Sequence, residues 1–337
     1  MNLAKFSRRR YTEGKTPLEK LTRLTQALDG PNIYMKRDDL LGLAGGGNKT
    51  RKLEFLIADA LAKGADTIIT CGAVQSNHCR LTLAASVKEG LKCRLVIEER
   101  VKGSYEPKAN GNNFLFQLMG VEKTKVVPGG SNMMEEMELV AEEVRVKGGV
   151  PYIIPGGGSN EIGATGYVAC AEEILGQAFD MGLNIDYVVT TSGSTGTHAG
   201  LITGFYGCNS NIPIIGIGIN RKKAPQEEAV YDLVKKTAKR VGITSTIPRD
   251  SVVVYDDYIG EGYSIPTDAM VDAVIMLART ECILMDPVYT GKAMSGFIDL
   301  IKKGFFKKGE NVVFLHTGGS PALYAYAPTF WKQIEVR

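Results

Sequence analysis

Apolar and β-branched residues fall into short runs along the chain, and longer stretches of helical character separate these runs. The runs predict strands at residues 33–36, 67–71, 94–98, 125–127, 152–154, 187–191, 214–219, 252–255 and 312–316. The stretches between them predict helices at 18–28, 51–62, 81–88, 135–146, 164–177, 226–240, 268–279 and 293–302. Strands that alternate with helices indicate an α/β fold, in which parallel sheets are covered by helices on both faces.

Two glycine clusters offer the best places to divide the chain, because no long linker or shift in composition marks a boundary. They are residues 45–47 and 156–158. A length of 337 residues fits about two domains. We therefore predict a larger domain formed by residues 1–50 and 160–337, interrupted by a smaller α/β domain at 51–159.

Composition and charge exclude several classes of protein. The chain is 44% apolar and 23% charged, close to the average for globular proteins, so wholesale disorder is excluded. Its net charge of +3 provides no strong field for nucleic acid or a membrane surface. The apolar runs are too short to span a membrane, and no apolar stretch follows residues 8–10, where a secretory signal would need one.

Cysteine usage favours a reducing compartment. The six cysteines lack the paired spacing of a disulfide framework or a zinc site, and they stand at positions 71, 79, 93, 170, 208 and 282. We expect buried, reduced thiols in a cytoplasmic protein. A metal site is not expected, because none of the three histidines has a second ligand at helical spacing.

Glycines and small polar residues gather where predicted strands end. In open α/β sheets, ligands bind at these ends. The segments are 45–49, 75–78, 192–198, 288–292 and 316–319. All three histidines, His78, His198 and His316, fall within them. The sequence therefore predicts that these segments line one site.

The segment that begins at Asn48 places three cations in the first turn of a predicted helix. Asn48 suits the N-cap position, and Lys49, Arg51 and Lys52 follow it. The positive end of the helix dipole disfavours cations there by a few tenths of a kcal/mol each. Three interpretations stay open: a solvated basic face, compensation by a nearby anion, or a partly neutral Lys49 that forms a Schiff base with a carbonyl group.

The segment from Ser192 to Thr197 lies between a predicted strand and a helical stretch at 198–206. Its small residues allow backbone N–H groups to converge at the positive end of that helix, which favours a phosphate ligand. The alternative is an ordinary strand-to-helix turn. The Walker A, GxGxxG and GxSxG patterns are absent.

Four further positions have a functional and a structural interpretation. Ser76 and Asn77 open a predicted helix, where they can bind a carboxylate or simply cap the helix. Tyr289 and Tyr263 lie on glycine-containing turns and suit either an active site or the core.

In chain order, these segments resemble one family of pyridoxal-phosphate enzymes, the aminocyclopropane-carboxylate deaminase and D-cysteine desulfhydrase family. The resemblance extends from about residue 17 to 328 and rests on residues 36–39, 46–54, 75–78, 192–200, 286–293 and 316–319. It implies the tryptophan-synthase-β-like fold, called fold type II, with two α/β domains and pyridoxal phosphate between them. The larger domain would bind the cofactor, and the family is usually homodimeric.

The resemblance also implies residue roles at the cofactor. Lys49 would hold it through a Schiff base and later take the Cα proton, and Asn77 would bind the O3′ atom of its ring. Thr290 or Thr317 would lie near the ring nitrogen. The phosphate would be held by Gly193, Ser194, Thr195, Gly196 and Thr197.

Further roles concern the substrate. By resemblance, Ser76 would meet the substrate carboxylate, with Asn77 and His78 beside it. Tyr289 would lie near the leaving group, and Tyr263 would be a second active-site tyrosine.

One departure from the family pattern bears on the reaction. Family members that open a cyclopropane ring have Glu after the tyrosine, whereas this sequence has Thr290. A neutral hydroxyl cannot keep the ring nitrogen protonated, which suits β-elimination better than ring opening. The resemblance therefore favours a carbon–sulfur lyase that converts D-cysteine to pyruvate, ammonia and hydrogen sulfide, with L-cysteate sulfo-lyase and 1-aminocyclopropane-1-carboxylate deaminase as alternatives.

Two other classes of function stay open. A non-catalytic protein could bind a phosphate-bearing ligand, although it would not need Lys49. A hydrolase could use Ser76 or Ser194 with a histidine, although the chain lacks the nucleophile elbow and an obvious acid partner.

Overall fold

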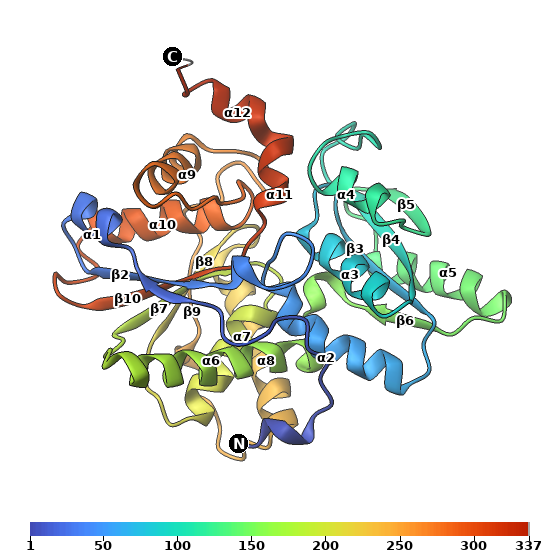
Figure 1. Cartoon of the computed structure of the whole chain (residues 1–337), viewed down its shortest axis with the longest axis horizontal. Coiled ribbons are helices and arrows are strands. Elements are labelled where there is room, and N and C mark those ends of the chain that lie inside the picture. The colour runs from blue at the N-terminus through green and yellow to red at the C-terminus, as the bar shows by residue number, and fades with distance from the viewer. Residues whose placement is uncertain (336–337) are drawn as a thin grey trace.

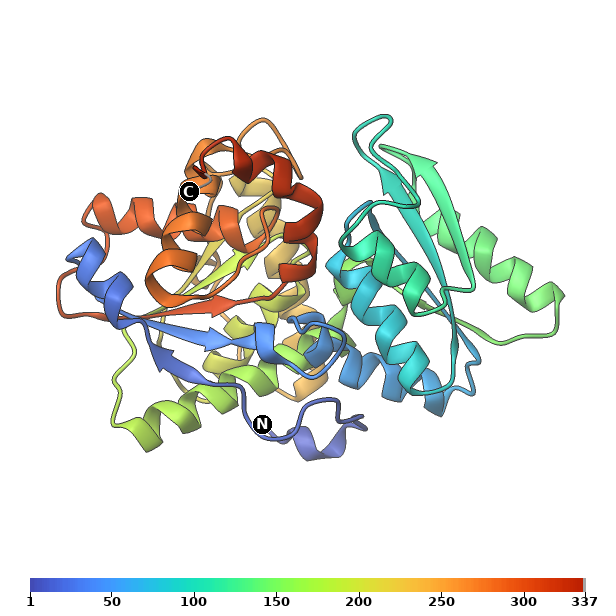
Figure 2. The same cartoon turned by 45° about the horizontal axis from the view of Figure 1, so that its top comes forward.

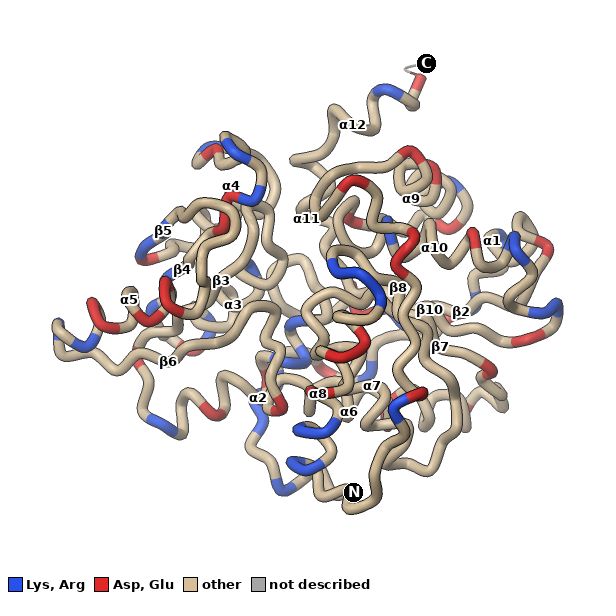
Figure 3. Tube along the Cα trace, turned by 180° about the vertical axis from the view of Figure 1, so that it is seen from behind, with Lys and Arg blue, Asp and Glu red and all other residues tan. Residues whose placement is uncertain are grey.

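The computed structural model describes residues 1–335, and the strands of these residues form one six-stranded and one four-stranded sheet. The two sheets lie side by side, each with its own helices (Figures 1 and 2). Acidic and basic positions are intermingled over both parts when the molecule is seen from behind (Figure 3). This distribution agrees with the small net charge.

The six-stranded sheet has the order β1-β2-β10-β7-β8-β9. Its strands are β1 (Leu18–Lys20), β2 (Asn32–Arg37), β7 (Tyr187–Ser192), β8 (Ile214–Gly218), β9 (Val253–Tyr255) and β10 (Asn311–His316). All neighbours are parallel except β1, which pairs antiparallel with β2. The C-terminal ends of β7 and β10 therefore lie at the same edge of the sheet.

The four-stranded sheet is parallel throughout and has the order β5-β4-β3-β6. It consists of β3 (Thr67–Ala73), β4 (Lys92–Glu99), β5 (Lys123–Pro128) and β6 (Pro151–Ile154). Its central strands are rich in β-branched residues because helices cover both of their faces.

Helices cover both faces of each sheet. In the larger sheet, α1 (Thr22–Leu28), α9 (Asp268–Glu281) and α10 (Thr290–Lys302) pack on one face, and α6 (Glu161–Met181), α7 (Gly196–Gly207) and α8 (Lys223–Val241) on the other. In the smaller sheet, α5 (Met133–Val146) covers one face, and α2 (Lys49–Ala62), α3 (Asn77–Lys88) and α4 (Asn112–Leu118) cover the other. The predicted α/β architecture is confirmed.

Each predicted strand is present, but the prediction of a helix over 18–28 is wrong at its start. Residues Leu18–Lys20 form β1, which pairs with Tyr34–Lys36, and the helix begins only at Thr22. This pairing depends on a strand that follows later in the chain, so local periodicity could not reveal it. Helix α4 and the short helices α11 (Ser320–Leu323) and α12 (Ala327–Trp331) were not expected.

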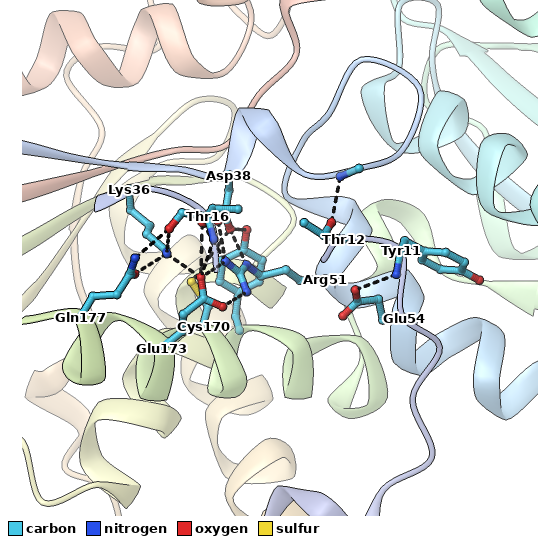
Figure 4. Close-up of polar contacts among 12 residues, drawn as sticks. Tyr11, Thr12, Thr16, Lys36, Asp38, Arg51, Glu54, Cys170, Glu173 and Gln177 are labelled. Carbon is cyan, nitrogen blue, oxygen red and sulfur yellow. Dashed lines mark hydrogen bonds and ion pairs between the residues drawn. The ribbon is translucent and has the colours of Figure 1, made fainter. Parts of the chain in front are cut away.

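A buried ionic network attaches α2 to the larger sheet and to α6 (Figure 4). The Arg51 guanidinium lies 2.8 Å from both Asp38 and Glu173. Glu173 also accepts a hydrogen bond of 2.5 Å from Lys36, and the Tyr167 hydroxyl donates to Asp38 at 2.6 Å. Burial opposes ionisation of Asp38, yet the Arg51 charge holds the pKa of that carboxyl below its usual value. The network therefore fixes the helix that begins with Lys49.

The expectation that the cysteines are buried is met only in part. Cys71, Cys79, Cys93 and Cys170 are buried as expected, whereas Cys208 is half-buried and Cys282 exposed. Among residues 1–335, the helices are too short or too polar to cross a membrane. The division of the chain at residues 50 and 160 into two domains stays a prediction.

Candidate active site

Two adjoining cavities lie between the two sheets, at the ends of their strands. Counted out to their open mouths, the first has a volume of about 460 Å³ and the second of about 1020 Å³. The predicted residues that line the first cavity are Lys49, Asn77, His78, Gly193, Ser194, Thr195, Thr197, Tyr289 and Thr317. Ser76 and Tyr263 line the second, which shares Lys49 and Tyr289 with the first. The structure therefore brings most of the predicted site together.

Lys49 is the first residue of α2, and its amine is buried in the wall shared by both cavities. Its Nζ atom donates to Asn48 Oδ1 at 3.0 Å and lies 5.7 Å from the centre of the Tyr289 ring. Burial lowers the pKa of Lys49 to about 8; the Asp286 carboxylate opposes this shift and the Arg80 guanidinium adds to it. A large fraction of the amine is therefore neutral near pH 8, as a nucleophile requires.

Asn48 connects this lysine to the predicted phosphate-binding segment. It occupies the N-cap position of α2, as expected, but its side chain does not cap the helix. Instead Oδ1 accepts from Lys49, and Nδ2 donates to the Thr197 hydroxyl at 2.9 Å.

The segment at 193–197 has the geometry of an anion-binding loop. Thr195 has a φ of +76°, an unfavourable conformation for a residue with a side chain, and α7 begins immediately after it. The first N–H groups of α7 have no carbonyl within the helix to bind. Gly196 itself does not line the cavity, but its N–H donates to Ser159 Oγ at 3.2 Å.

Lys52 and Ser159 also contact this loop, and neither was predicted. A Cβ atom at position 196 would lie 2.9 Å from both the Lys52 amine and Ser159 Oγ. The Lys52 amine donates to the Gly157 carbonyl at 3.0 Å, and burial, followed by the charge of Lys49, lowers its pKa well below the usual value. The unfavourable cation in the first turn of α2 was the sequence signal for Lys52, whereas Ser159 gave none.

Ser76 and Asn77 lie at the start of α3. Ser76 is the N-cap, and its Oγ accepts from the N–H of Cys79 at 3.1 Å. Asn77 Oδ1 accepts from Arg80 at 2.9 Å and from Asn112 at 2.8 Å. With both lone pairs of that oxygen engaged, Asn77 presents its amide N–H as the donor at the cavity. Arg80 and Asn112 were not predicted, because the sequence does not show which side chain orients another.

The three histidines have structural partners. The Thr70 hydroxyl donates to the Ile154 carbonyl and hydrogen-bonds His78 Nε2 at 2.7 Å. His198 bonds Ser192 at 3.1 Å, and His316 Nε2 donates to the Leu284 carbonyl at 3.0 Å without lining the cavity. Burial lowers the pKa of all three, that of His198 to about 4. They are therefore neutral near pH 7.

The hydrolase alternative finds no support in these contacts. A serine nucleophile needs a histidine within hydrogen-bond distance. Within the described chain, Ser76 accepts from Cys79, and Ser194 accepts from Ser159 at 3.0 Å, but no histidine contacts either hydroxyl.

Tyr263 and Tyr289 form a pair at the second cavity. Their hydroxyls are hydrogen-bonded to each other, and their rings meet edge to face at 5.7 Å. Burial raises the pKa of Tyr289 to about 12 despite the lowering effects of Tyr263 and Arg100. The Lys292 amine donates to the carbonyls of Ile259 at 2.6 Å and Gly262 at 2.7 Å, and so holds the loop that carries Tyr263.

The two candidate threonines differ in position. Thr317 lines the first cavity, whereas Thr290 does not. The Thr290 hydroxyl donates to Asp286 at 2.8 Å, and the same carboxylate accepts the backbone N–H groups of 288–290. Thr290 therefore closes a turn, and only Thr317 is placed to contact a ligand in this cavity.

A buried amine, an anion-binding loop and a cavity between two largely parallel sheets are the features of a fold type II pyridoxal-phosphate enzyme. A family model described as pyridoxal-phosphate dependent enzyme matches residues 9–318, and the chain belongs to this family. Its cofactor is pyridoxal phosphate. The residues fit this group, because the phosphate matches the loop with Lys52, and the aldehyde matches the amine of Lys49.

Solved structures resemble the chain over nearly its whole length. A protein described as an ACC deaminase homologue is 36% identical, with a TM-score of 0.89 and 98% of both chains covered. An O-ureido-L-serine synthase is 18% identical, with a TM-score of 0.67 and coverage of 97% of this chain and 95% of that one. Escherichia coli diaminopropionate ammonia lyase is 16% identical, with a TM-score of 0.64 and coverage of 95% and 86%. The last two show the fold alone.

Proposed function

We propose that this enzyme is a lyase that eliminates the β-substituent of a small amino acid, with D-cysteine as the leading substrate. The products would be pyruvate, ammonia and hydrogen sulfide. One observation carries this choice: none of the described residues that line the first cavity is Asp or Glu. A cavity without a carboxylate cannot keep the ring nitrogen protonated. It therefore favours a reaction in which negative charge leaves with the β-substituent.

Each residue group has a distinct role in the proposal. When bound, pyridoxal phosphate withdraws electrons from the substrate Cα atom. Lys49 would hold the cofactor and then move the Cα proton, since its amine is buried and its pKa is lowered to about 8. The loop from Gly193 to Thr197, with Lys52, would bind the phosphate. Asn77 would donate its amide N–H to the ring, and Thr317 would face the ring nitrogen.

The substrate would bind between α3 and the tyrosines. Ser76, Asn77 and His78 open α3, whose N-terminal N–H groups favour a carboxylate. Tyr289 and Tyr263 lie on the side of Lys49 that faces the second cavity, so a β-substituent would extend toward them.

Two alternatives use the same site. L-cysteate sulfo-lyase activity would release sulfite instead of sulfide. Deamination of 1-aminocyclopropane-1-carboxylate finds support in the name of the 36% identical homologue, but the lack of a carboxylate at the cavity opposes it. A non-catalytic binding protein would have no use for the buried amine of Lys49.

The proposal includes a cytoplasmic homodimer, as the family resemblance implies, with a larger cofactor-binding domain at 1–50 and 160–337 and a smaller domain at 51–159. Size-exclusion chromatography with light scattering would determine the oligomeric state.

The test is a substrate comparison with the purified holoenzyme. Assays would measure sulfide from D- and L-cysteine, sulfite from L-cysteate, and ammonia from the cyclopropane amino acid. We expect kcat/KM to be highest for D-cysteine. Turnover of the cyclopropane substrate alone would contradict the proposal.

A further inference from the structure

Arg100 follows the last residue of β4 and brings a positive charge to the wall of the second cavity. Its guanidinium carbon lies 4.2 Å from the centre of the Tyr263 ring. Because β4 belongs to the four-stranded sheet and Tyr263 to the loop between β9 and α9, this contact spans the two parts of the molecule. Arg100 therefore lies where both parts meet the ligand.

Glu98 holds this guanidinium by one edge only. Glu98 Oε2 accepts from Arg100 Nε at 2.6 Å, and Oε1 accepts the N–H of Gly130 at 3.0 Å. Within residues 1–335, the two terminal nitrogens of Arg100 make no hydrogen bond to the protein. Arginine offers these terminal groups as a planar fork that matches an oxyanion. Glu98 thus orients the fork without occupying it.

A series of contacts along the second cavity leads from Lys49 to this fork, on the side of the site proposed for the leaving group. The Lys49 amine lies next to the Tyr289 ring, and Tyr289 is hydrogen-bonded to Tyr263. The Arg100 guanidinium lies over the Tyr263 ring. Three methionines of α5, at 133, 134 and 137, supply apolar wall on the same cavity. The charged residues on this wall are Lys49, Arg100, Arg221 and Glu98, and His78 on the same wall is neutral.

We propose that Arg100 is a catalytic and specificity-determining residue that stabilises negative charge on the departing β-substituent. This inference rests on the proposed β-elimination. In that reaction the Cα proton passes to Lys49, the C–H electron pair forms the Cα–Cβ double bond, and the Cβ–S electron pair leaves on sulfur. One water completes the balance, so that D-cysteine and water give pyruvate, ammonia and hydrogen sulfide.

The substrate class follows from the charge. The preferred β-substituents are those that leave as anions, namely a thiolate or sulfite. A thiol is neutral until its bond breaks, whereas a sulfonate is charged throughout. Loss of Arg100 should therefore lower kcat for D-cysteine and raise KM for L-cysteate.

The test is Arg100→Gln in the holoenzyme, which keeps a polar side chain but removes the charge. We expect kcat for D-cysteine to fall at least about tenfold, with partial rescue in Arg100→Lys. The KM for L-cysteate should rise by a similar factor. Arg145→Gln is the matched control, because Arg145 is exposed on α5 and its side chain pairs with Glu142 and Glu138 outside both cavities. It should change neither constant.

Exchange of the α-proton of D-alanine in heavy water separates the possible outcomes, because alanine has no leaving group. Arg100→Gln should keep this exchange rate within about twofold of wild type. An equal loss of exchange and elimination, or an unchanged kcat for D-cysteine, would overturn the role of Arg100. If the wild type neither exchanges nor eliminates, the proposed function fails and this inference fails with it.

Discussion

Two sets of buried cations on the same helix, α2, have opposite surroundings. Arg51 is paired with two carboxylates, Asp38 and Glu173, each at 2.8 Å. Lys49 and Lys52 lie on either side of Arg51 in the sequence, and in the part of the chain that the structure describes they make hydrogen bonds to neutral oxygens, those of Asn48 and Gly157. One set is balanced within the protein, and the other is not.

The difference shows how to separate structural from functional charges in a buried helix. A buried cation without a bonded anion costs several kcal/mol, and the group responds by lowering its pKa. Arg51 avoids this cost through its network, whereas Lys49 and Lys52 show the lowered pKa. Lys49 lines the first cavity and Lys52 lies against the loop beside it, and we propose that the anionic cofactor supplies the missing charge.

The largest effect should follow from Lys49→Ala. Loss of the amine removes both the covalent attachment and the proton acceptor, so we expect turnover of D-cysteine to fall by at least about 10³-fold. The free energy of unfolding should change by less than about 1 kcal/mol, since no ion pair is broken. Steady-state kinetics and urea unfolding measure the two. Activity within tenfold of wild type would show that Lys49 is not the catalytic base.

Removal of a carboxylate from the paired set should lower stability, whereas Lys49→Ala should lower activity and leave stability nearly unchanged. Asp38→Asn leaves Arg51 with one carboxylate and should lower the free energy of unfolding by about 3 kcal/mol. Asp180→Asn is the control, because the Asp180–Lys15 pair is exposed and 3.5 Å apart, and it should cost less than about 0.5 kcal/mol. Equal effects of the two variants in urea unfolding would remove the distinction between the two sets.

The sequence was sufficient for the parallel strands, because a strand buried on both faces carries its signal in its own residues. It also predicted that Lys49 and most of the 193–197 loop lie together at one site, and the structure places them around one cavity. The prediction failed where a role depends on a partner distant in the sequence. Asn112 matters because it donates to Asn77 Oδ1 from another helix, and Ser159 matters because it accepts the N–H of Gly196. No local pattern shows such contacts.

Tyr289→Phe should have a smaller effect on activity than Lys49→Ala. If the hydroxyl assists departure of the β-substituent, kcat and kcat/KM for D-cysteine should fall together by about tenfold. β-Chloro-D-alanine, with a better leaving group, should lose less rate. An equal and large loss on both substrates would assign Tyr289 to an earlier step.

The mildest test varies the pH. The amine must be neutral to attack the cofactor aldehyde, and the pKa of Lys49 is lowered to about 8. Capture of added pyridoxal phosphate by the apoprotein should therefore speed up about tenfold per pH unit below 8 and level off above it. Stopped-flow absorbance measures the rate. A rise that continues to pH 10 would show that Lys49 has an ordinary pKa.

Which lysine holds the cofactor is the central question, because burial lowers the pKa of three amines, those of Lys49, Lys52 and Lys292. Borohydride reduction of the holoenzyme fixes the cofactor to its lysine, and peptide mass spectrometry then locates it. We expect the added pyridoxyl phosphate mass on Lys49 and its absence in Lys49→Ala. Modification of Lys52 or Lys292 instead, or no modified peptide from a protein saturated with cofactor, would contradict it.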